Sequence, residues 1–337
     1  MDFNLKNFLE NISFPILENN GNPIIYLSDT QKLALENFKE EIKRGACKFK
    51  KFSCICGGNE KLLIAEKDRY GIPIKIYLCL KCSSIFCGEI LDEKSLEKFY
   101  EKYYRRIYSG NLTKYELFYQ QLETGYEFLK ILRKLNILEK IYNVFEVGCS
   151  SGGILYTFKK IGKNVKGCDL DKDYLLYGRS KGLHLKVGGY DKFLKNIRNA
   201  DLVILSHVLE HLPNPIEALK KVLKNLELGK YILIGLPSHY GKWNLIYRFQ
   251  NAHIIQFFDN DFLKHIVVTL GCRIIYFDTY PDVVLALQKV RALANVKAIY
   301  NFRKNKKKIE DIIEHIKLSF LKVLKRKGLL NKGIFKL

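Results

Sequence analysis

Short apolar runs alternate with stretches of helical spacing through the middle of the chain. The runs are rich in Val, Ile, Leu and Phe, as buried parallel strands are. They cover residues 143–147, 165–169, 184–187, 201–206 and 230–236. A helix is predicted to begin at Asn214-Pro215, an N-cap followed by Pro at the first helical position, and to end near Gly229. This alternation predicts an α/β fold with a doubly wound, mostly parallel sheet.

Two later segments could close this sheet. Arg273 to Phe277 and Val283 to Gln288 are apolar runs of strand length. Periodicity alone would equally permit a helix over residues 283–300.

The rest of the chain divides into smaller units. Ser28-Asp29-Thr30-Gln31 has the form of a capping box, and Leu33, Phe38 and Ile42 supply apolar positions for the helix that follows. Residues 61–66 and 72–78 form a hairpin-like pair, and 92–140 have helical spacing. We therefore predict an N-terminal helical segment (1–46), a small β unit (47–90), a helical linker (91–140), the α/β domain (141–290) and a C-terminal helix (291–337).

The C-terminal segment is basic and amphipathic. Residues 303–337 hold 12 Lys or Arg against three acidic residues, interleaved with Ile and Leu. Such a helix could lie on an anionic membrane surface. Packing of its apolar stripe on the protein is the alternative that we favour.

Length and cysteine content limit the possible classes. With 337 residues the chain can bury a core of about 150 residues and carry accessory units. No apolar run approaches the length of a membrane span, and the first residues do not resemble a basic signal peptide. We expect a cytoplasmic protein, with peripheral attachment at the inner face of the membrane as an option. Nine cysteines in a large chain indicate reduced thiols and metal binding rather than a disulfide framework.

The formal net charge of +22 would suit a nucleic-acid partner. Of the 57 basic residues, however, only 12 are Arg, the side chain whose planar fork contacts phosphates and bases in pairs. The excess of Lys therefore favours a solvated basic surface over a nucleic-acid interface.

The most informative segment is the loop that follows the first strand of the α/β domain. Val144 to Val147 give way to the small residues of Gly148 to Gly153 and then to an apolar helix. Small residues let a ligand approach the backbone, and free N–H groups at a helix start favour negative charge. The loop lacks the Gly-x-Gly-x-x-Gly of dinucleotide binders and the Gly-Lys-Ser/Thr of a P-loop.

A second strand ends at Asp169, 17 positions after Gly152. At that distance a carboxylate can meet the two hydroxyls of a ribose. An amino-acid end at the loop together with a ribose suggests S-adenosylmethionine as the ligand.

Several blocks, in this order, resemble the class I S-adenosylmethionine-dependent methyltransferases. The blocks are Glu146 to Leu155, Val165 to Asp171, Tyr174 to Gly178, Gly182-Leu183 and Asp201 to Leu212. The chain is similar to a subgroup with an N-terminal zinc ribbon, found among enzymes that decorate sugars and surface polysaccharides. The resemblance covers roughly residues 50 to 290. It implies a Rossmann-like sheet of seven strands, the last antiparallel, preceded by the zinc-ribbon unit and a helical lid.

The resemblance also implies which residues bind the cofactor. Glu146 and the loop would hold the methionine part, Asp169 the ribose, and the lid would contribute from its helices. The implied residues are Glu146, Gly148, Cys149, Ser150, Gly152, Asp169, Leu170, Gly189, Tyr190, Ser206, His207, Tyr104 and Gln121. Many such enzymes have an acidic side chain where Gly189 stands, so backbone groups of Gly189 and Tyr190 are the expected adenine contacts.

Three histidines are candidates for catalysis. His207 and His211 follow the fourth strand, at the edge of the sheet where ligands bind in open α/β folds. A sugar hydroxyl must lose its proton during methylation, and imidazole suits that role. His253 lies in a segment that lines the acceptor side in the subgroup. Cofactor contact or packing is the alternative for His207 and His211, and a hydrogen-bonded place in the core is the alternative for His253.

Four cysteines have the spacing of a metal site. They are Cys54-x-Cys56 and, 22 residues later, Cys79-x-x-Cys82. Four thiolates suit tetrahedral Zn²⁺ in a closed, structural shell. Cys47 or Cys87 could replace one of the ligands, and four reduced thiols without metal are the alternative.

The sequence thus favours a methyltransferase that acts on a small molecule or saccharide, such as a nucleotide-linked sugar, a polysaccharide or a lipid-linked glycan. An RNA methyltransferase with a zinc ribbon and a non-catalytic protein that has kept the fold are the alternatives.

Overall fold

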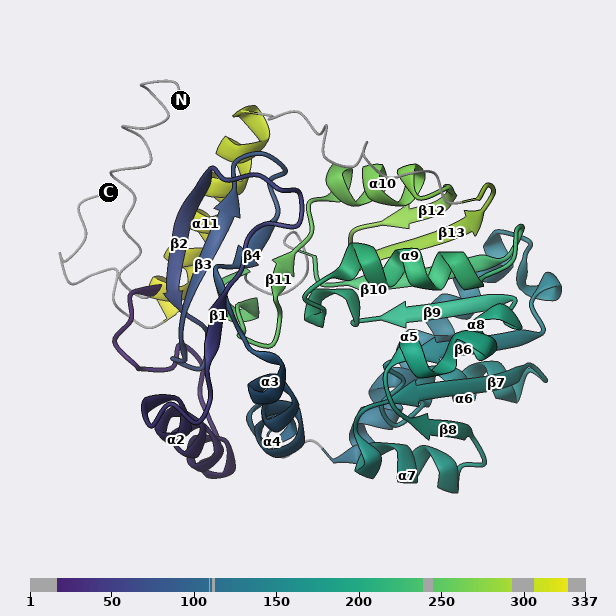
Figure 1. Ribbon diagram of the computed structural model, residues 1–337, viewed down its shortest axis with the longest axis horizontal. Helices are drawn as coiled ribbons and strands as arrows, with labels where there is room; N and C mark the ends of the chain where they lie inside the picture. The colour runs from purple at the N-terminus through teal and green to yellow at the C-terminus, as the bar shows by residue number, and fades with distance from the viewer. Residues whose placement is uncertain (1–16, 109, 111–112, 239–244, 293–305, 327–337) are drawn as a thin grey trace.

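A seven-stranded sheet is the largest feature of the computed structural model, which describes residues 17–108, 110, 113–238, 245–292 and 306–326. The strand order is β12-β13-β10-β9-β6-β7-β8 (Figure 1). The strands are β6 (Asn143–Val147), β7 (Asn164–Asp169), β8 (His184–Val187), β9 (Leu202–Ser206), β10 (Tyr231–Leu236), β12 (Cys272–Asp278) and β13 (Val283–Lys289). Strands β6 to β10 are parallel, and β13 is antiparallel to both of its neighbours. The predicted Rossmann-like sheet is confirmed.

The segment that the sequence left open between strand and helix is a strand as far as Lys289. Residues 293–300, the end of the alternative helix, lie outside the described residues.

Helices cover both faces of the sheet because successive strand residues point to opposite sides. Val144, Leu202 and Ile204 pack with one set of helices, whereas Phe145 and Val203 pack with the other. The first set comprises α5 (Lys114–Lys134), α6 (Gly153–Lys160) and α7 (Lys172–Ser180), and the second comprises α8 (Leu194–Arg198), α9 (Pro215–Asn225) and α10 (Asn260–Thr269). The central strands β9 and β10, which are covered on both faces, are therefore almost entirely apolar.

Two predicted helix starts have different capping. In α2 (Asp29–Lys43) the Ser28 side chain accepts from Gln31 N and the Gln31 side chain accepts from Ser28 N, which confirms the capping box. Helix α9 begins at Pro215 as predicted, but Asn214 makes no side-chain capping bond, and the helix ends at Asn225 rather than near Gly229.

The apolar face of α2 differs from the prediction. Ala34, Leu35 and Phe38 are buried, whereas Leu33 is 63% exposed. The buried stripe is therefore rotated away from Leu33.

A second sheet combines two distant parts of the chain. Its order is β11-β4-β3-β2, in which β2 (Lys61–Lys67), β3 (Pro73–Cys79) and β4 (Ile85–Cys87) form the predicted small β unit. Strand β11 (Ile255–Phe257) follows β10 of the large sheet and pairs with β4. A short ribbon of β1 (Phe49–Lys51) and β5 (Glu89–Leu91) extends the unit. One apolar core continues from this sheet under the large sheet.

Short helices connect the β unit to the large sheet. These are α3 (Glu93–Phe99), a π-helical turn over Tyr100–Tyr104, and α4 (Arg105–Tyr108). Rings of Phe99, Tyr100 and Tyr104 pack within 6.2 Å of one another. This connection occupies the region predicted as a lid.

Helix α11 (Lys306–Arg326) packs on the protein through its apolar stripe. Ile309, Ile312, Ile313 and Ile316 are each at most 1% exposed. Lys308 Nζ lies 2.7 Å from a carboxylate oxygen of Asp259, which anchors the start of the helix to α10. Packing is the alternative that the sequence favoured, and membrane-surface binding stays a prediction. Among the described residues, no helix is long and apolar enough to span a membrane.

Asp68 joins the small β unit to the segment before β11. Its Oδ1 accepts from Tyr70 N and Ile72 N, both at 2.9 Å, and its Oδ2 accepts from Asn251 N at 3.1 Å. The side chain is fully buried, and burial raises the pKa of Asp68 to about 6. Three backbone donors from two parts of the chain thus depend on one carboxylate.

We expect Asp68→Ala to lower the free energy of unfolding by about 3 kcal/mol or more, because three buried N–H groups lose their acceptor. Denaturation in urea measures this. The exposed Glu123 on α5 provides a control, since Glu123→Ala should change stability by no more than about 0.5 kcal/mol. Equal losses in the two variants would contradict the role of Asp68.

Candidate functional site

The loop after β6 has the backbone geometry that the sequence led us to expect. Gly148, Ser150 and Gly152 have φ values of +70°, +48° and +81°. A Cβ atom at Gly148 would lie 2.7 Å from the Val208 side chain, and one at Gly152 would lie 2.6 Å from Leu183. Glycine is therefore needed at both positions for the turn and for close packing. The contact with Val208 also joins the loop to the segment after β9.

Gln121 on α5 supports the loop from one side. Its Oε1 accepts from Gly153 N at 3.1 Å and from Ser151 Oγ at 3.0 Å, and its Nε2 donates to Cys149 O at 3.2 Å. The amide thereby satisfies one of the free N–H groups at the start of α6. The structure places Gln121 as a support of the loop, and contact between Gln121 and the cofactor stays a prediction.

Glu146 is a buried carboxylate at the end of β6. The residue is 1% exposed, and within the described residues neither carboxylate oxygen has a hydrogen-bond partner. Burial, together with the charge of Asp169, raises the pKa of Glu146 well above its ordinary value. Because an unpaired buried carboxylate is costly, this position fits a ligand that brings hydrogen-bond donors or positive charge. The ammonium group of a methionine moiety has both.

Asp169 at the end of β7 is held by backbone donors. Ser150 N donates to one oxygen at 2.7 Å, and Asp171 N donates to the other at 2.8 Å. Arg105 of the lid lies beside Asp169. Its Nε donates to Asp171 at 3.0 Å, and its Nη2 donates to Ser150 Oγ at 2.9 Å. Its guanidinium lies 4.3 Å from the centre of the Tyr174 ring. The lid is thus bonded directly to the loop.

The predicted adenine region lies after β8. Gly189 precedes a short helical turn that starts at Tyr190, and the Tyr190 ring packs against the core beside Phe193. Leu170, next to Asp169, is 64% exposed at the same edge of the sheet. No contact of these residues distinguishes adenine binding from packing, so their role stays a prediction.

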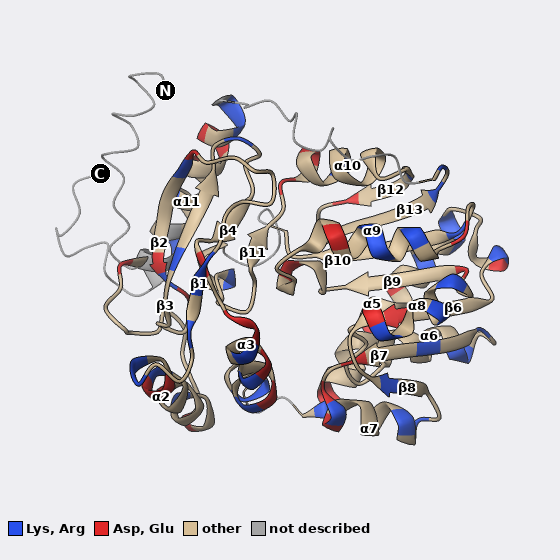
Figure 2. Cartoon of the chain, in the orientation of Figure 1, with Lys and Arg blue, Asp and Glu red and all other residues tan. Residues whose placement is uncertain are grey.

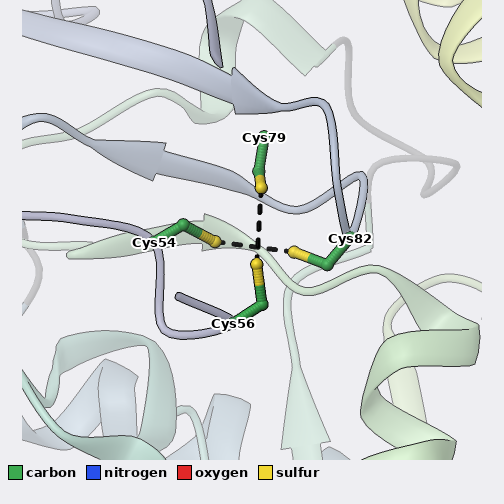
Figure 3. A group of neighbouring side chains, drawn as sticks. All are labelled: Cys54, Cys56, Cys79 and Cys82. Carbon is green, nitrogen blue, oxygen red and sulfur yellow. Dashed lines mark hydrogen bonds between the residues drawn. The ribbon is translucent and has the colours of Figure 1, made fainter. Parts of the chain in front are cut away.

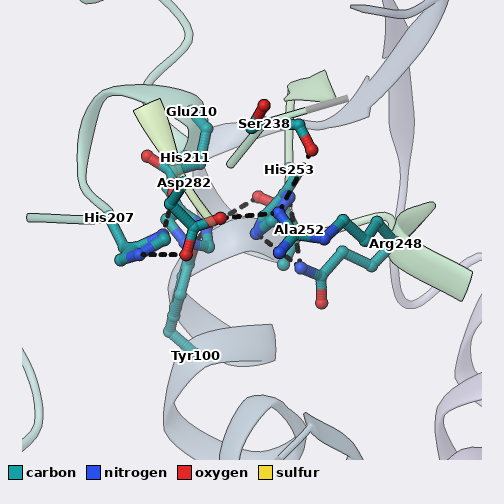
Figure 4. Close-up of polar contacts among 10 residues, drawn as sticks. Tyr100, His207, Glu210, His211, Ser238, Arg248, Ala252, His253 and Asp282 are labelled. Carbon is teal, nitrogen blue, oxygen red and sulfur yellow. Dashed lines mark hydrogen bonds and ion pairs between the residues drawn. The ribbon is translucent and has the colours of Figure 1, made fainter. Parts of the chain in front are cut away.

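His207 stands where β9 ends at Ser206, in a backbone conformation with φ of +52°. Its Nδ1 lies 3.1 Å from Glu210 Oε1, and its Nε2 lies 3.9 Å from Asp282 Oδ2 (Figure 4). Arg248 Nη1 donates to Asp282 Oδ1 at 2.7 Å. Burial lowers the pKa of His207, but the hydrogen bond and charge of Glu210 outweigh this effect and raise the pKa overall.

His211 and His253 face each other beside this group (Figure 4). Their ring centres are 4.8 Å apart at 83°. The Ala252 carbonyl and the Tyr100 hydroxyl lie 2.9 and 3.0 Å from His211 Nδ1, and the Gln250 amide nitrogen contacts both ring nitrogens of His253. Burial lowers the pKa of His211 and lowers that of His253 well below its ordinary value. The structure therefore brings together all three predicted histidines.

Tyr100 and Tyr104 lie between the loop side and the histidine side of the site. Burial raises the pKa of both hydroxyls, and the charges of Glu210 and Asp169 raise it further. Both tyrosine rings pack near His211, with ring centres 6.3 and 6.0 Å away. The lid therefore contacts both sides, as expected for an element that excludes water.

The four predicted metal ligands converge (Figure 3). The Sγ atoms of Cys54 and Cys82, and those of Cys56 and Cys79, are 3.5 Å apart, and all four residues are buried. Thiolates at about 2.3 Å from a tetrahedral Zn²⁺ would lie about 3.8 Å apart, so the cluster has the required size. Gly58 N donates to Cys56 Sγ at 3.3 Å.

Cys47 and Cys87, the alternative ligands, lie elsewhere. Cys87 Sγ donates to the His253 carbonyl at 3.1 Å and accepts from Gln256. Cys47 Sγ donates to Glu41 at 3.4 Å. Neither thiol belongs to the cluster of four.

Three polar residues of the site were not among the predicted site residues. Glu210 was recognised only as part of the segment 206–211, although it holds His207 in place. Arg248 ends a short helical turn (Leu245–Arg248) after β10, and Asp282 comes directly before β13; neither stands in a motif. Their place could be found only from the fold, which returns these segments to the edge of β9 and β10.

Family comparison identifies the domain. A family model described as a methyltransferase domain matches residues 110–276, about half of the chain. No curated protein matches the chain in sequence.

The solved structures similar to the chain include two methyltransferases and a third protein, DesVI. One is an S-adenosylmethionine-dependent methyltransferase from Archaeoglobus fulgidus, with 22% identity, coverage of 57% of this chain and 85% of that chain, and a TM-score of 0.37. Another is an amino pentose methyltransferase of calicheamicin biosynthesis from Micromonospora echinaspora. It is 15% identical, the match covers 53% of this chain and 98% of that chain, and the TM-score is 0.40. A third is DesVI from Streptomyces venezuelae. It is 14% identical, the match covers 52% of this chain and 97% of that chain, and the TM-score is 0.39.

The assignment follows from the family match together with the seven-stranded sheet and its glycine loop. It removes support from the hypothesis of a non-catalytic protein. The chain therefore carries a class I S-adenosylmethionine-dependent methyltransferase domain.

Proposed function

We propose that the protein methylates a hydroxyl-bearing acceptor of the saccharide class, such as a nucleotide-linked sugar, a polysaccharide or a lipid-linked glycan. The observation that carries the proposal is the group formed by His207, Glu210, Arg248 and Asp282 at the carboxyl end of β9, beside the loop. It combines a proton acceptor with a paired carboxylate and guanidinium, which suits an acceptor with several hydroxyls.

His207 is the residue that can take up the acceptor proton. An ionised Glu210 can only accept, so in the neutral His207 ring the proton lies on Nδ1 and the lone pair on Nε2. The His207 side chain is 46% exposed, so an acceptor can approach the ring. S-adenosylmethionine supplies the methyl group, and transfer to a hydroxyl breaks its S–C bond, forms an O–C bond and leaves the hydroxyl proton on Nε2 of His207.

Asp282 and Arg248 are suited to positioning the acceptor. Their side chains are 30% and 13% exposed, and their mutual ion pair fixes both. A carboxylate accepts from sugar hydroxyls and a guanidinium donates to sugar or phosphate oxygens. Methyl transfer is an in-line displacement, so alignment of the acceptor accounts for much of the rate.

On the cofactor side, Glu146 and the residues Gly148, Cys149, Ser150 and Gly152 would hold the methionine part, and Asp169 would hold the ribose. The unpaired oxygens of Glu146 and the contacts that fix Asp169 support this assignment. Cofactor contacts from Leu170, Gly189, Tyr190, Ser206, His207, Tyr104 and Gln121 belong to the same proposal.

The cluster of four cysteines would bind one structural Zn²⁺. A shell of four thiolates leaves no position for water or substrate, so the metal would stabilise the small β unit without entering the reaction. The sulfur spacing and complete burial support zinc over free thiols.

Basic residues alone give little support for an RNA acceptor. Figure 2 shows Lys and Arg on elements throughout the molecule, including α2, α7 and α9, with acidic residues among them on α2 and α9. An interspersed pattern of this kind is typical of a solvated surface. The acceptor assay below therefore tests methylation of RNA as the alternative outcome.

Replacement of Asp169 should weaken cofactor binding. We expect Asp169→Ala to raise the Kd of S-adenosylhomocysteine at least tenfold, measured by calorimetry, because the ribose loses two charged hydrogen bonds. Asp173→Ala, an exposed carboxylate on α7, should bind like the wild type. Unchanged affinity in Asp169→Ala would refute the ribose assignment.

Metal analysis checks the zinc proposal. Cys79→Ser should lose about one zinc per chain and unfold at a lower temperature, because structural zinc contributes its binding energy to folding. Cys272→Ser removes another buried thiol and should keep the zinc. Equal zinc content in both variants would overturn the site.

The acceptor assay incubates the protein with labelled cofactor and pooled sugar nucleotides, with detection of products by mass. We expect methylated sugar and a fall in kcat of about 100-fold or more in His207→Ala, with cofactor affinity kept. His184→Ala, an exposed histidine on β8, is the control. Methylation of structured RNA but not of sugars would contradict the proposal.

A further inference from the structure

We propose that Glu210, His211 and His253 bind a divalent transition-metal ion. This is a second site, separate from the four cysteines. One ligand atom of each residue lies within 4.8 Å of the others. Nitrogen and oxygen ligands at about 2.1 Å from a tetrahedral metal ion lie about 3.4 Å apart, so the side chains would close by up to about 1.4 Å around the ion.

Glu210 supplies an independent sign of a missing partner. The residue is 0% exposed, and its Oε1 is bonded to His207 Nδ1. Its Oε2 is buried and has no hydrogen-bond partner among the described residues. A buried carboxylate needs compensation by a donor or a cation, and a metal ion beside the two imidazoles would provide it.

The ring of His211 is oriented as in a metal ligand. The Ala252 carbonyl can only accept, so the proton of a neutral His211 ring lies on Nδ1, and the Tyr100 hydroxyl also lies beside Nδ1. The lone pair is therefore on Nε2. A metal-binding histidine characteristically donates its other ring N–H to a carbonyl or carboxylate in this way.

His253 is already in place against His211, with the ring centres 4.8 Å apart. It is 7% exposed, and the Gln250 amide contacts its ring nitrogens. Ion binding would replace one of these contacts. Arg248, the nearby guanidinium, is neutralised by its pair with Asp282.

Two imidazoles and one carboxylate select a first-row transition ion such as Zn²⁺, Mn²⁺ or Co²⁺ over Ca²⁺ or Mg²⁺. Three protein ligands leave coordination positions open. His211 is only partly buried and His207 is half exposed, so the open side faces the acceptor region. The role of the ion rests on the proposed function: it would bind an oxygen atom of the acceptor beside His207.

Calorimetry with Co²⁺ tests the site in the full chain, after zinc has filled the four-cysteine site. We expect one further equivalent of Co²⁺, and absorption bands of a cobalt site without thiolate ligands. Glu210→Gln and His211→Ala should each weaken binding by about 100-fold or more, and His184→Ala should bind as the wild type does.

An unchanged affinity for S-adenosylhomocysteine in the His211→Ala variant, whose replaced side chain is partly exposed, verifies that the variant keeps its fold. Absence of a further equivalent, or equal affinity in the wild type and both variants, would overturn the inference. Because binding is measured without an acceptor, it succeeds or fails independently of the saccharide assay.

Discussion

Burial of carboxylates at one edge of the parallel sheet is the constraint on which the site depends. Glu146 and Glu210 end up almost completely buried, each with at least one oxygen unpaired among the described residues. Asp169, by contrast, has both carboxylate oxygens bonded to backbone N–H groups. An unpaired buried carboxylate is unfavourable in isolation, so the fold keeps it only where a ligand or ion completes it. In the proposed function, the two unpaired positions would lie on the donor side and on the acceptor side.

The acceptor side depends on the way the chain returns to the small β unit. Strand β11 leaves the large sheet and joins β4, which brings His253 to His211. Asp68 fixes the same segment through Asn251 N. The small β unit, through this shared sheet and Asp68, therefore helps to hold the segment that carries His253.

The sequence predicted the parts of this architecture that are local. The strands, the glycine loop, Asp169 and the four cysteines each follow from spacing or from a short block, and the large sheet and the cysteine cluster are present as expected. No sequence pattern predicts that Asp282 and Arg248 lie at His207, because both come from separate segments that only the fold brings together. Leu33 was misplaced because a single apolar residue does not decide which helix face is buried.

A structure of the protein with S-adenosylhomocysteine tests the central claim most directly. The account predicts the amino group of the ligand within hydrogen-bond distance of the Glu146 carboxylate and both ribose hydroxyls on Asp169, with the sulfur directed toward His207. A ligand bound elsewhere, or Glu146 still without a partner in the complex, would contradict it.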